Sequence, residues 1–185
     1  MSNKNKKSLP GAIATAAAIV VTVLGGTAAA QGPVDAVGLA SSTAQNQYTP
    51  GGVNPAPNVF VSLPGAVVNM VVPPGATRLF LATYSAESAC YGGPAAAANW
   101  CPVRILIGGV EGAPASGADF AFDSNDNGTA SNATWESHSM QRFRRISNTG
   151  NVPLAVPIIV QRTTTNVGTT LRLDDWTLSV LRSQP

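Results

Sequence analysis

Short runs of alternating apolar and polar residues dominate the chain from residue 59 onward. Residues 59–63, 66–72 and 77–84 are rich in Val, Leu, Phe and Tyr, and each run is bounded by Pro or Gly. A further run at 103–107 ends at two glycines. None of these runs reaches helix length, and turn signals recur about every ten residues, as in β-sandwiches and barrels. The pattern therefore predicts strands.

The alternation resumes late in the chain, over residues 152–161. Every second residue from Val152 to Val160 is Val, Leu or Ile, while Pro153 and Pro157 lie on the opposite face. Proline cannot donate a hydrogen bond to a neighbouring strand. We therefore expect this strand to lie at a sheet edge or to carry a bulge.

The last run, over residues 169–182, changes the parity of its apolar positions. Leu171 and Leu173 share one face, whereas the apolar residues from Trp176 onward fall on the other. Because one extra residue switches the facing of a strand, we expect a β-bulge at Asp174-Asp175. With seven or eight strands and no helix pattern after residue 30, the sequence predicts an all-β protein, a single two-sheet antiparallel β-sandwich that is jelly-roll-like.

The first thirty residues have a different character from this domain. Lysines precede an apolar run over residues 9–24, and Ala28-Ala29-Ala30 supplies a small-residue cleavage site. The pattern predicts a secretory signal peptide over 1–30, with an uncleaved membrane anchor as the alternative. Residues 31–58 are rich in Gly, Pro, Ser and Gln and show no period, so they are expected to form a flexible leader before a sandwich over 59–185.

Composition narrows the class of function. The lysines all precede residue 8, which leaves the exported chain with arginines and carboxylates in nearly equal number. A near-neutral chain lacks the basic surface of a nucleic-acid-binding protein. We expect a secreted protein, extracellular or attached to the cell surface, with no nucleic-acid partner and no membrane contact after cleavage of the signal peptide.

Cys90 and Cys101 are the two cysteines of the chain. In an exported protein, an even pair of cysteines is most simply a disulfide. The loop between them contains Tyr91 and Trp100. By the loop-entropy model, closing a ring of this size stabilises the fold by about 3 kcal/mol.

The stretch from Asp123 to Gly128 matches the first half of an oxygen-ligand calcium loop. Asp123, Asn125 and Asn127 occupy alternate positions, and a glycine follows. Calcium prefers several oxygen ligands, which alternate side chains in a tight loop can supply. The twelfth position is Thr134, so the motif is not an EF-hand. The other reading is a hairpin whose Asn-Gly turn needs no metal.

Glu136 and His138 are expected to share one face of a strand over residues 135–140, with Trp135 turned inward. A Glu beside a His can serve as a general acid–base pair or as two metal ligands. The alternative is a solvated histidine that bonds a nearby carboxylate. The sequence contains no Gly-x-Ser-x-Gly motif that would indicate a serine nucleophile.

Three aromatic and two basic residues are candidates for ligand binding. Tyr91, Trp100 and Trp135 could stack on sugars, or they could simply cover one end of the sandwich. Arg142 and Arg144 could bind an anionic polymer, or they could pair with the carboxylates between residues 119 and 126.

Four segments carry a resemblance to known proteins: residues 100–111, 119–124, 135–140 and 171–180, the last containing Leu-Asp-Asp-Trp. They resemble small exported bacterial β-sandwich proteins of unassigned function. The layout over residues 59–182 is also similar to C1q/TNF-like jelly rolls. That resemblance implies a binding or assembly module, trimeric in some cases, and it implies no catalytic residue.

These observations favour a secreted, non-enzymatic binding module that recognises a surface polymer, a glycan or a partner protein. One alternative is a structural protein of the cell envelope that assembles with copies of itself as a homo-oligomer. Another is a small hydrolase that uses Glu136 and His138. No cofactor is required by the first two hypotheses, apart from calcium if the site at Asp123 forms.

Overall fold

The computed structural model describes residues 34–49, 57–115, 120–126, 130–131 and 133–184 of the chain. These residues form strands and turns and contain no helix, hence none that could span a membrane. The strands are β1 (Val34–Ser42), β2 (Asn46–Tyr48), β3 (Val61–Val72), β4 (Thr77–Gly92), β5 (Ala98–Cys101), β6 (Val103–Ile107), β7 (Val110–Glu111), β8 (Asp123–Asp126), β9 (Glu136–Ser147), β10 (Leu154–Arg162) and β11 (Thr169–Ser183).

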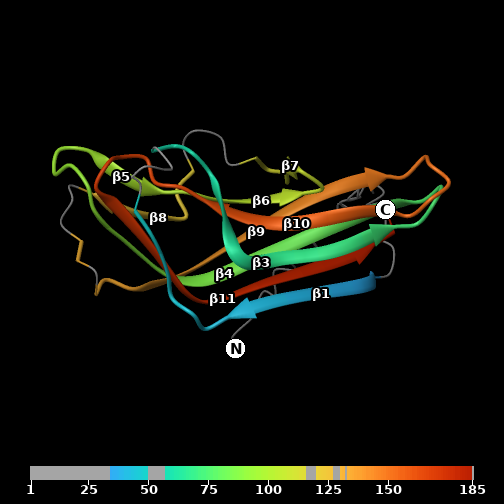
Figure 1. The fold of residues 1–185 in the computed structure, drawn as a ribbon, viewed down its shortest axis with the longest axis horizontal. Helices are drawn as coiled ribbons and strands as arrows, with labels where there is room; N and C mark the ends of the chain where they lie inside the picture. The colour runs from blue at the N-terminus through green and yellow to red at the C-terminus, as the bar shows by residue number, and fades with distance from the viewer. Residues whose placement is uncertain (1–33, 50–56, 116–119, 127–129, 132, 185) are drawn as a thin grey trace, which may run out of the picture.

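The strands pair into two large antiparallel sheets and one small sheet. Sheet A has the order β1-β11-β4-β9, with β2 also paired to β11, and sheet B has the order β3-β10-β6-β7. Strands β5 and β8 form sheet C, which lies at one end of the elongated molecule (Figure 1). Because most successive long strands alternate between sheets A and B, the sandwich is jelly-roll-like, as the sequence predicts.

The core lies between the inner faces of sheets A and B. Strand β4 buries Phe80, Ala82 and Tyr84 in alternation, and β6 and β10 bury their own alternate residues against them. The largest fully buried side chains are Tyr84, Phe80, Ile105, Ile107, Ile158, Leu171, Leu173 and Leu178. Burial of each such side chain stabilises the fold by about 1.5–3 kcal/mol.

The predicted bulge in the last strand is confirmed. The pairing of β11 with β4 shifts register between Asp174 and Thr177, and Asp175 adopts a positive φ of 44°. Leu173 before the bulge and Trp176 after it are both buried. The extra residue therefore turns both apolar sets toward the core.

The prediction of a flexible leader over 31–58 is wrong for the strands β1 and β2, both of which pair with β11. The outward-facing Val37 and Leu39 of β1 are exposed, and the inward-facing residues are Ala and Gly, so no strong alternation marks the strand in the sequence. Gly38 is required by close packing, because a Cβ there would collide with Val68 of β3. The predicted signal peptide lies outside the described residues.

Of two expectations about prolines, one is confirmed in part and the other is wrong. Strand β10 is central in sheet B, between β3 and β6, so it does not lie at an edge, but its pairing with β3 does show the expected irregularity, a register shift between Ile159 and Gln161. The opposing irregularity in β3 contains Pro64-Gly65, which the sequence suggested as a turn between two strands. Gly65 has a φ of 78°, so the chain bends there and continues as one strand.

Asp35 fastens edge strand β1 to its neighbours. Its carboxylate accepts hydrogen bonds from Arg182 of β11 at 2.8 Å and Arg78 of β4 at 2.9 Å. The hydrogen bond from Arg182, with the positive charge of both guanidinium groups, lowers the pKa of Asp35 below its ordinary value. A lowered carboxyl pKa adds stability at neutral pH, and this stability is lost as the pH falls through the folded-state pKa.

We expect Asp35→Asn to weaken the acid dependence of the unfolding free energy. At neutral pH the variant should be slightly less stable than the wild type, and the difference should shrink below about pH 4, where the wild-type carboxylate becomes protonated. Urea unfolding between pH 2 and pH 7 measures this. Parallel pH profiles for the two proteins would show that Asp35 makes no such contribution.

Candidate functional sites at one end and on one face of the sandwich

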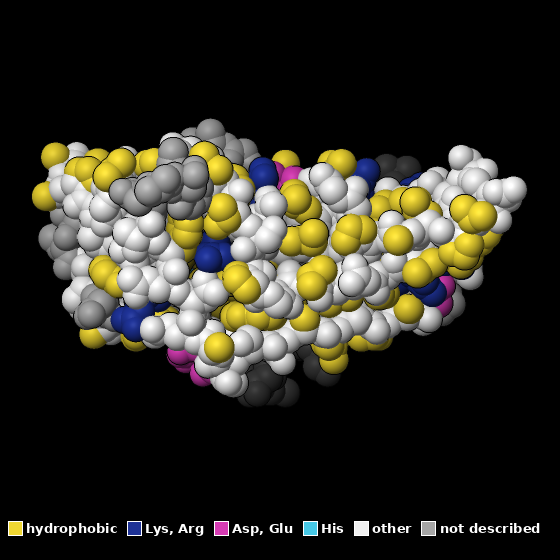
Figure 2. Space-filling model, viewed as in Figure 1, with side chains coloured by type: hydrophobic (Ala, Val, Ile, Leu, Met, Phe, Trp, Pro, Cys, Tyr) yellow, Lys and Arg dark blue, Asp and Glu magenta, His cyan; other side chains and the backbone are white. Residues whose placement is uncertain are grey.

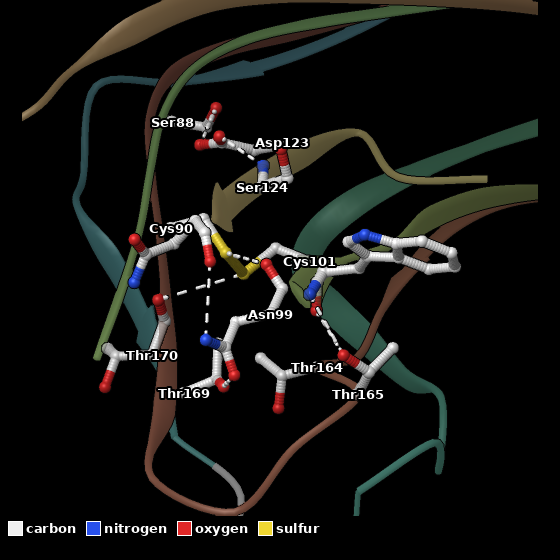
Figure 3. The surroundings of a disulfide bond; sticks show 12 residues. Ser88, Cys90, Asn99, Cys101, Asp123, Ser124, Thr164, Thr165, Thr169 and Thr170 are labelled. Carbon is white, nitrogen blue, oxygen red and sulfur yellow. Dashed lines mark hydrogen bonds between the residues drawn. A yellow bond between two sulfur atoms is a disulfide. The ribbon is translucent and has the colours of Figure 1, made fainter. Parts of the chain in front are cut away.

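The predicted disulfide between Cys90 and Cys101 is present, and both residues are buried. It joins β4 of sheet A to β5 of sheet C. Strand β5 pairs in turn with β8, and Cys101 lies directly opposite Asp123 in this register. The disulfide therefore fixes the position of Asp123 relative to sheet A (Figure 3).

Asn99 is the polar centre of this end of the molecule. Its side chain is fully buried on β5, two residues before Cys101. The amide nitrogen donates to three backbone carbonyls, and the amide oxygen accepts two side-chain hydrogen bonds, so the group joins five chain positions: Pro94, Ala97, Asn125, Asn166 and Thr169. Buried amides with several partners of this kind order the loops around them.

Asp123 on β8 is a buried carboxylate held by two serines. The hydroxyl of Ser88, itself fully buried on β4, donates to Oδ2 at 2.8 Å. The backbone N–H of Ser124 donates to Oδ1 at 2.6 Å. Figure 3 shows Ser88 and Asp123 pointing toward each other beside the disulfide. The carboxylate is thus fixed in orientation before any ligand is considered.

Glu136 and His138 on β9 meet Asp123 at this point. The Nε2 atom of His138 lies 3.2 Å from Oε2 of Glu136 and 3.9 Å from Oδ1 of Asp123. This nitrogen is buried, yet it makes no hydrogen bond in the described structure. The ring of Phe122 packs against the imidazole, with 5.5 Å between centroids. Glu136 is the open side of the group, with 59% of its side chain exposed.

The structure thus combines residues that the sequence assigned to two separate candidate sites. Asp123 from the calcium hypothesis lies beside Glu136 and His138 from the hydrolase hypothesis. Asn125 has a structural role, because its amide donates to the Gly92 carbonyl and its oxygen accepts from the Ala130 N–H. Asn127 lies outside the described residues.

The expected facing of strand 135–140 also needs correction. Met140 is buried, and Glu136 and His138 share its parity, so all three lie on the inner face of the strand, where Glu136 at the start of β9 stays exposed. Trp135, which was expected to point inward, is half-buried and contacts the guanidinium of Arg172, 5.3 Å from the ring centroid. The burial of Met140, and not of Trp135, therefore determines which residues of β9 face inward.

The other two aromatic candidates are also half-buried. Tyr91 follows Cys90 on β4, and Trp100 precedes Cys101 on β5, where its backbone bonds Thr165. Among the described residues, no ring contact joins Tyr91, Trp100 and Trp135 to one another. A sugar platform made of these three rings stays a prediction.

The side chains of Arg142 and Arg144 lie on the inner face of β9. Arg142 is buried, with its guanidinium 4.9 Å from the Phe120 ring centroid, and burial lowers its pKa. Arg144 donates to the carbonyls of Ile107 and Gly108 and so joins β9 to the β6–β7 turn. These contacts give both residues structural roles, whereas the neighbouring Arg145 is exposed on the outer face.

The outer face of sheet A carries a row of apolar side chains that no local sequence pattern reveals. Val37 is paired with Leu181, Leu181 with Leu81, and Leu81 with Phe143, so the row crosses β1, β11, β4 and β9. Phe143 is 48% exposed and Val37 is 59% exposed.

A hollow of about 480 Å³ lies beside one end of this row. It is lined by Leu79, Leu81, Phe143 and Arg145, which belong to β4 and β9. In each strand these side chains alternate with inward-facing residues. The pairing across strands is the only signal that brings them together.

Comparison with known proteins adds no relative. No protein-family model matches the chain, and no curated protein is significantly similar to it in sequence. A functional assignment for this chain therefore rests on its own residues.

Proposed function

We propose that the protein is a secreted, non-enzymatic binding domain whose partner is a second copy of this chain, bound to the outer face of sheet A. The observation that carries this proposal is the apolar row Val37–Leu181–Leu81–Phe143. Exposed hydrophobic side chains that are scattered singly are ordinary on protein surfaces. A row that crosses every long strand of a sheet is a contiguous patch, and such patches mark interaction sites.

The charge of this face favours another copy as the partner. In a symmetric contact the same patch meets itself, so like charges within it would repel. The next row along the sheet is Leu39, Ser179, Thr83 and Gln141, which is also uncharged. Arg145 lies at the margin, beside the hollow. Two copies of this face can therefore meet without bringing like charges of these two rows together.

The outer face of sheet B is the competing surface. There Val67 pairs with Ile159, and Ile159 with Leu106, which gives a shorter apolar row across three strands. Figure 2 shows hydrophobic side chains scattered among uncharged atoms on the face in view, with charged side chains in a few places only. Sheet A is favoured because its row is longer, contains an exposed aromatic residue and borders a hollow that can accept a side chain. Aromatic residues in pockets dominate binding energy at interfaces.

Two further observations support the proposal. The disulfide is typical of proteins that work in an oxidising compartment outside the cytosol, which agrees with the signal-peptide pattern of residues 1–30. The resemblance to C1q/TNF-like jelly rolls implies an assembly module. Self-association is therefore favoured over a catalytic role for the sandwich as a whole.

We expect Phe143→Arg to weaken self-association by about 30-fold or more, because a central aromatic contact is worth about 2 kcal/mol and a charge would then face its own copy. Light scattering after size-exclusion chromatography measures the mass. The protein can begin at Gln31, because every described strand and the disulfide lie after that residue. Phe143 is 48% exposed, so the substitution should leave the fold intact.

Val67→Arg is the matched control on sheet B, where Val67 is 42% exposed. It should keep the mass of the wild type. Dissociation by Val67→Arg with no effect of Phe143→Arg would transfer the interface to sheet B and overturn the proposal.

A further inference from the structure

We propose that Asp123, Glu136 and His138 form a binding site for a divalent transition metal, and that the ion is zinc. The site is independent of the proposed self-association, because these three side chains lie on the inner side of sheet A at the end covered by β8. Each residue offers one ligand atom, and the three atoms all lie within 4.8 Å of one another.

The spacing of the ligand atoms suits a small ion. Zinc bonds of about 2.1 Å in a tetrahedral shell place neighbouring ligand atoms about 3.4 Å apart. The imidazole nitrogen is 3.2 Å from the Glu136 oxygen and 3.9 Å from the Asp123 oxygen. These two distances lie on either side of the tetrahedral value, and the two carboxylate oxygens lie within 4.8 Å of each other. A movement of the exposed Glu136 side chain would therefore complete three corners of the shell.

The state of His138 Nε2 is the second observation. A buried polar atom without a hydrogen bond is rare in folded proteins and calls for an explanation, such as an ion. Nε2 is buried, lies between two carboxylates and makes no hydrogen bond. The nitrogen and one oxygen of each carboxylate lie within 4.8 Å of one another, so a metal ion bound among them would satisfy all three groups.

The surroundings of Asp123 resemble the supporting shell of a metal site. Ligating carboxylates are usually held by hydrogen bonds from further residues, and loss of such a partner weakens metal binding about 10–100-fold. The buried hydroxyl of Ser88 donates a hydrogen bond to Oδ2 of Asp123. Ser88 lies on β4, whereas Glu136 and His138 both lie on β9. The disulfide strengthens this arrangement because Cys101 pairs with Asp123.

The donor set decides the class of metal. Calcium and magnesium prefer shells made of oxygen alone, whereas an imidazole nitrogen with carboxylates suits zinc and related ions. Three protein ligands leave the fourth position of a tetrahedral shell open. The cluster is open to solvent on the side of Glu136, whose side chain is largely exposed. A zinc ion here would tie β8 to β9 and so close the end of the sandwich.

Isothermal titration of the oxidised, tag-free protein with zinc chloride, after treatment with a chelator, tests the proposal. We expect one zinc ion per chain, with calcium and magnesium binding at least about tenfold more weakly. Zinc at about one hundred times its Kd should raise the Tm by roughly 5–10 °C. An ordinary ion pair between His138 and its carboxylates predicts no saturable uptake, and that result would overturn the proposal.

Variants locate the ion. Glu136→Gln and His138→Asn should abolish measurable zinc binding, and Glu136→Gln should leave the fold intact because its side chain is largely exposed. Ser88→Ala should bind zinc about 10–100-fold more weakly. Glu87→Gln is the matched control, since Glu87 is an exposed carboxylate on β4 facing the other way, and it should bind as the wild type does. Zinc binding that survives both ligand substitutions would show that the ion lies elsewhere.

Discussion

Replacement of both cysteines, Cys90→Ala with Cys101→Ala, is expected to lower the unfolding free energy by about 3 kcal/mol. The physical cause is conformational entropy. The two cysteines are 11 residues apart in the sequence, and the unfolded chain gains entropy when the disulfide no longer closes the loop between them. Loss of the two buried sulfur atoms also removes packing from the core, which acts in the same direction. For a domain of this size the Tm should fall by about 6–12 °C.

Chemical denaturation of the oxidised wild type, the reduced wild type and the double variant measures this effect. The reduced protein is the internal control, because it has the same sequence without the closed loop and should unfold near the double variant. A double variant as stable as the oxidised wild type would contradict the assignment of the disulfide as a stabilising link.

Asn99→Ala is expected to lower the unfolding free energy by about 3–5 kcal/mol, because it deletes one partner from each of five hydrogen bonds at a fully buried position. A buried donor or acceptor that loses its partner costs about 1–3 kcal/mol, and some of these groups can turn to solvent. The loss should be concentrated at the end of the sandwich that carries the disulfide.

Asn69→Ala is the matched control, since Asn69 is an exposed asparagine on the outer face of β3. Its effect should stay within about 0.5 kcal/mol. Equal stabilities for Asn99→Ala and Asn69→Ala would show that the Asn99 network does not hold this end of the molecule. Hydrogen exchange would then be expected to show no local opening of β5 and β8.

Local patterns in the sequence predicted much of the fold. The bulge in β11 could be found because the parity of Leu171 and Leu173 differs from that of Trp176, and parity is visible within one segment. Strand β1 could not be found this way. Its existence depends on pairing with β11, and its large side chains face outward, so its own residues carry no core signal.

The candidate metal site was only partly visible for the same reason. Glu136 and His138 are two residues apart, so a strand places them on one face and the sequence suggested them as a pair. Asp123 joins them through contacts that are remote in sequence, namely the pairing of β8 with β5 and the disulfide from β5 to β4. A lone histidine and an acidic loop therefore suggested two sites where the structure has one cluster.

The apolar row on sheet A shows the limit most clearly. Val37, Leu81, Phe143 and Leu181 each occur as a single outward-facing residue in its own strand. Only the registers of three strand pairs reveal that they are neighbours. The sequence also did not show that Arg142 contacts Phe120 or that Arg144 bonds the β6–β7 turn, because both contacts are remote along the chain. Binding of an anionic polymer by these two arginines stays a prediction.

Sedimentation equilibrium of the unmodified protein tests the central claim most directly. Protein beginning at Gln31 would be measured across a wide concentration range, at low salt and at high salt. The proposal predicts an oligomer whose mass persists at high salt, because an interface formed by an uncharged apolar row is not screened. A mass equal to one chain at every concentration, or an oligomer that high salt dissociates, would contradict self-association through this face.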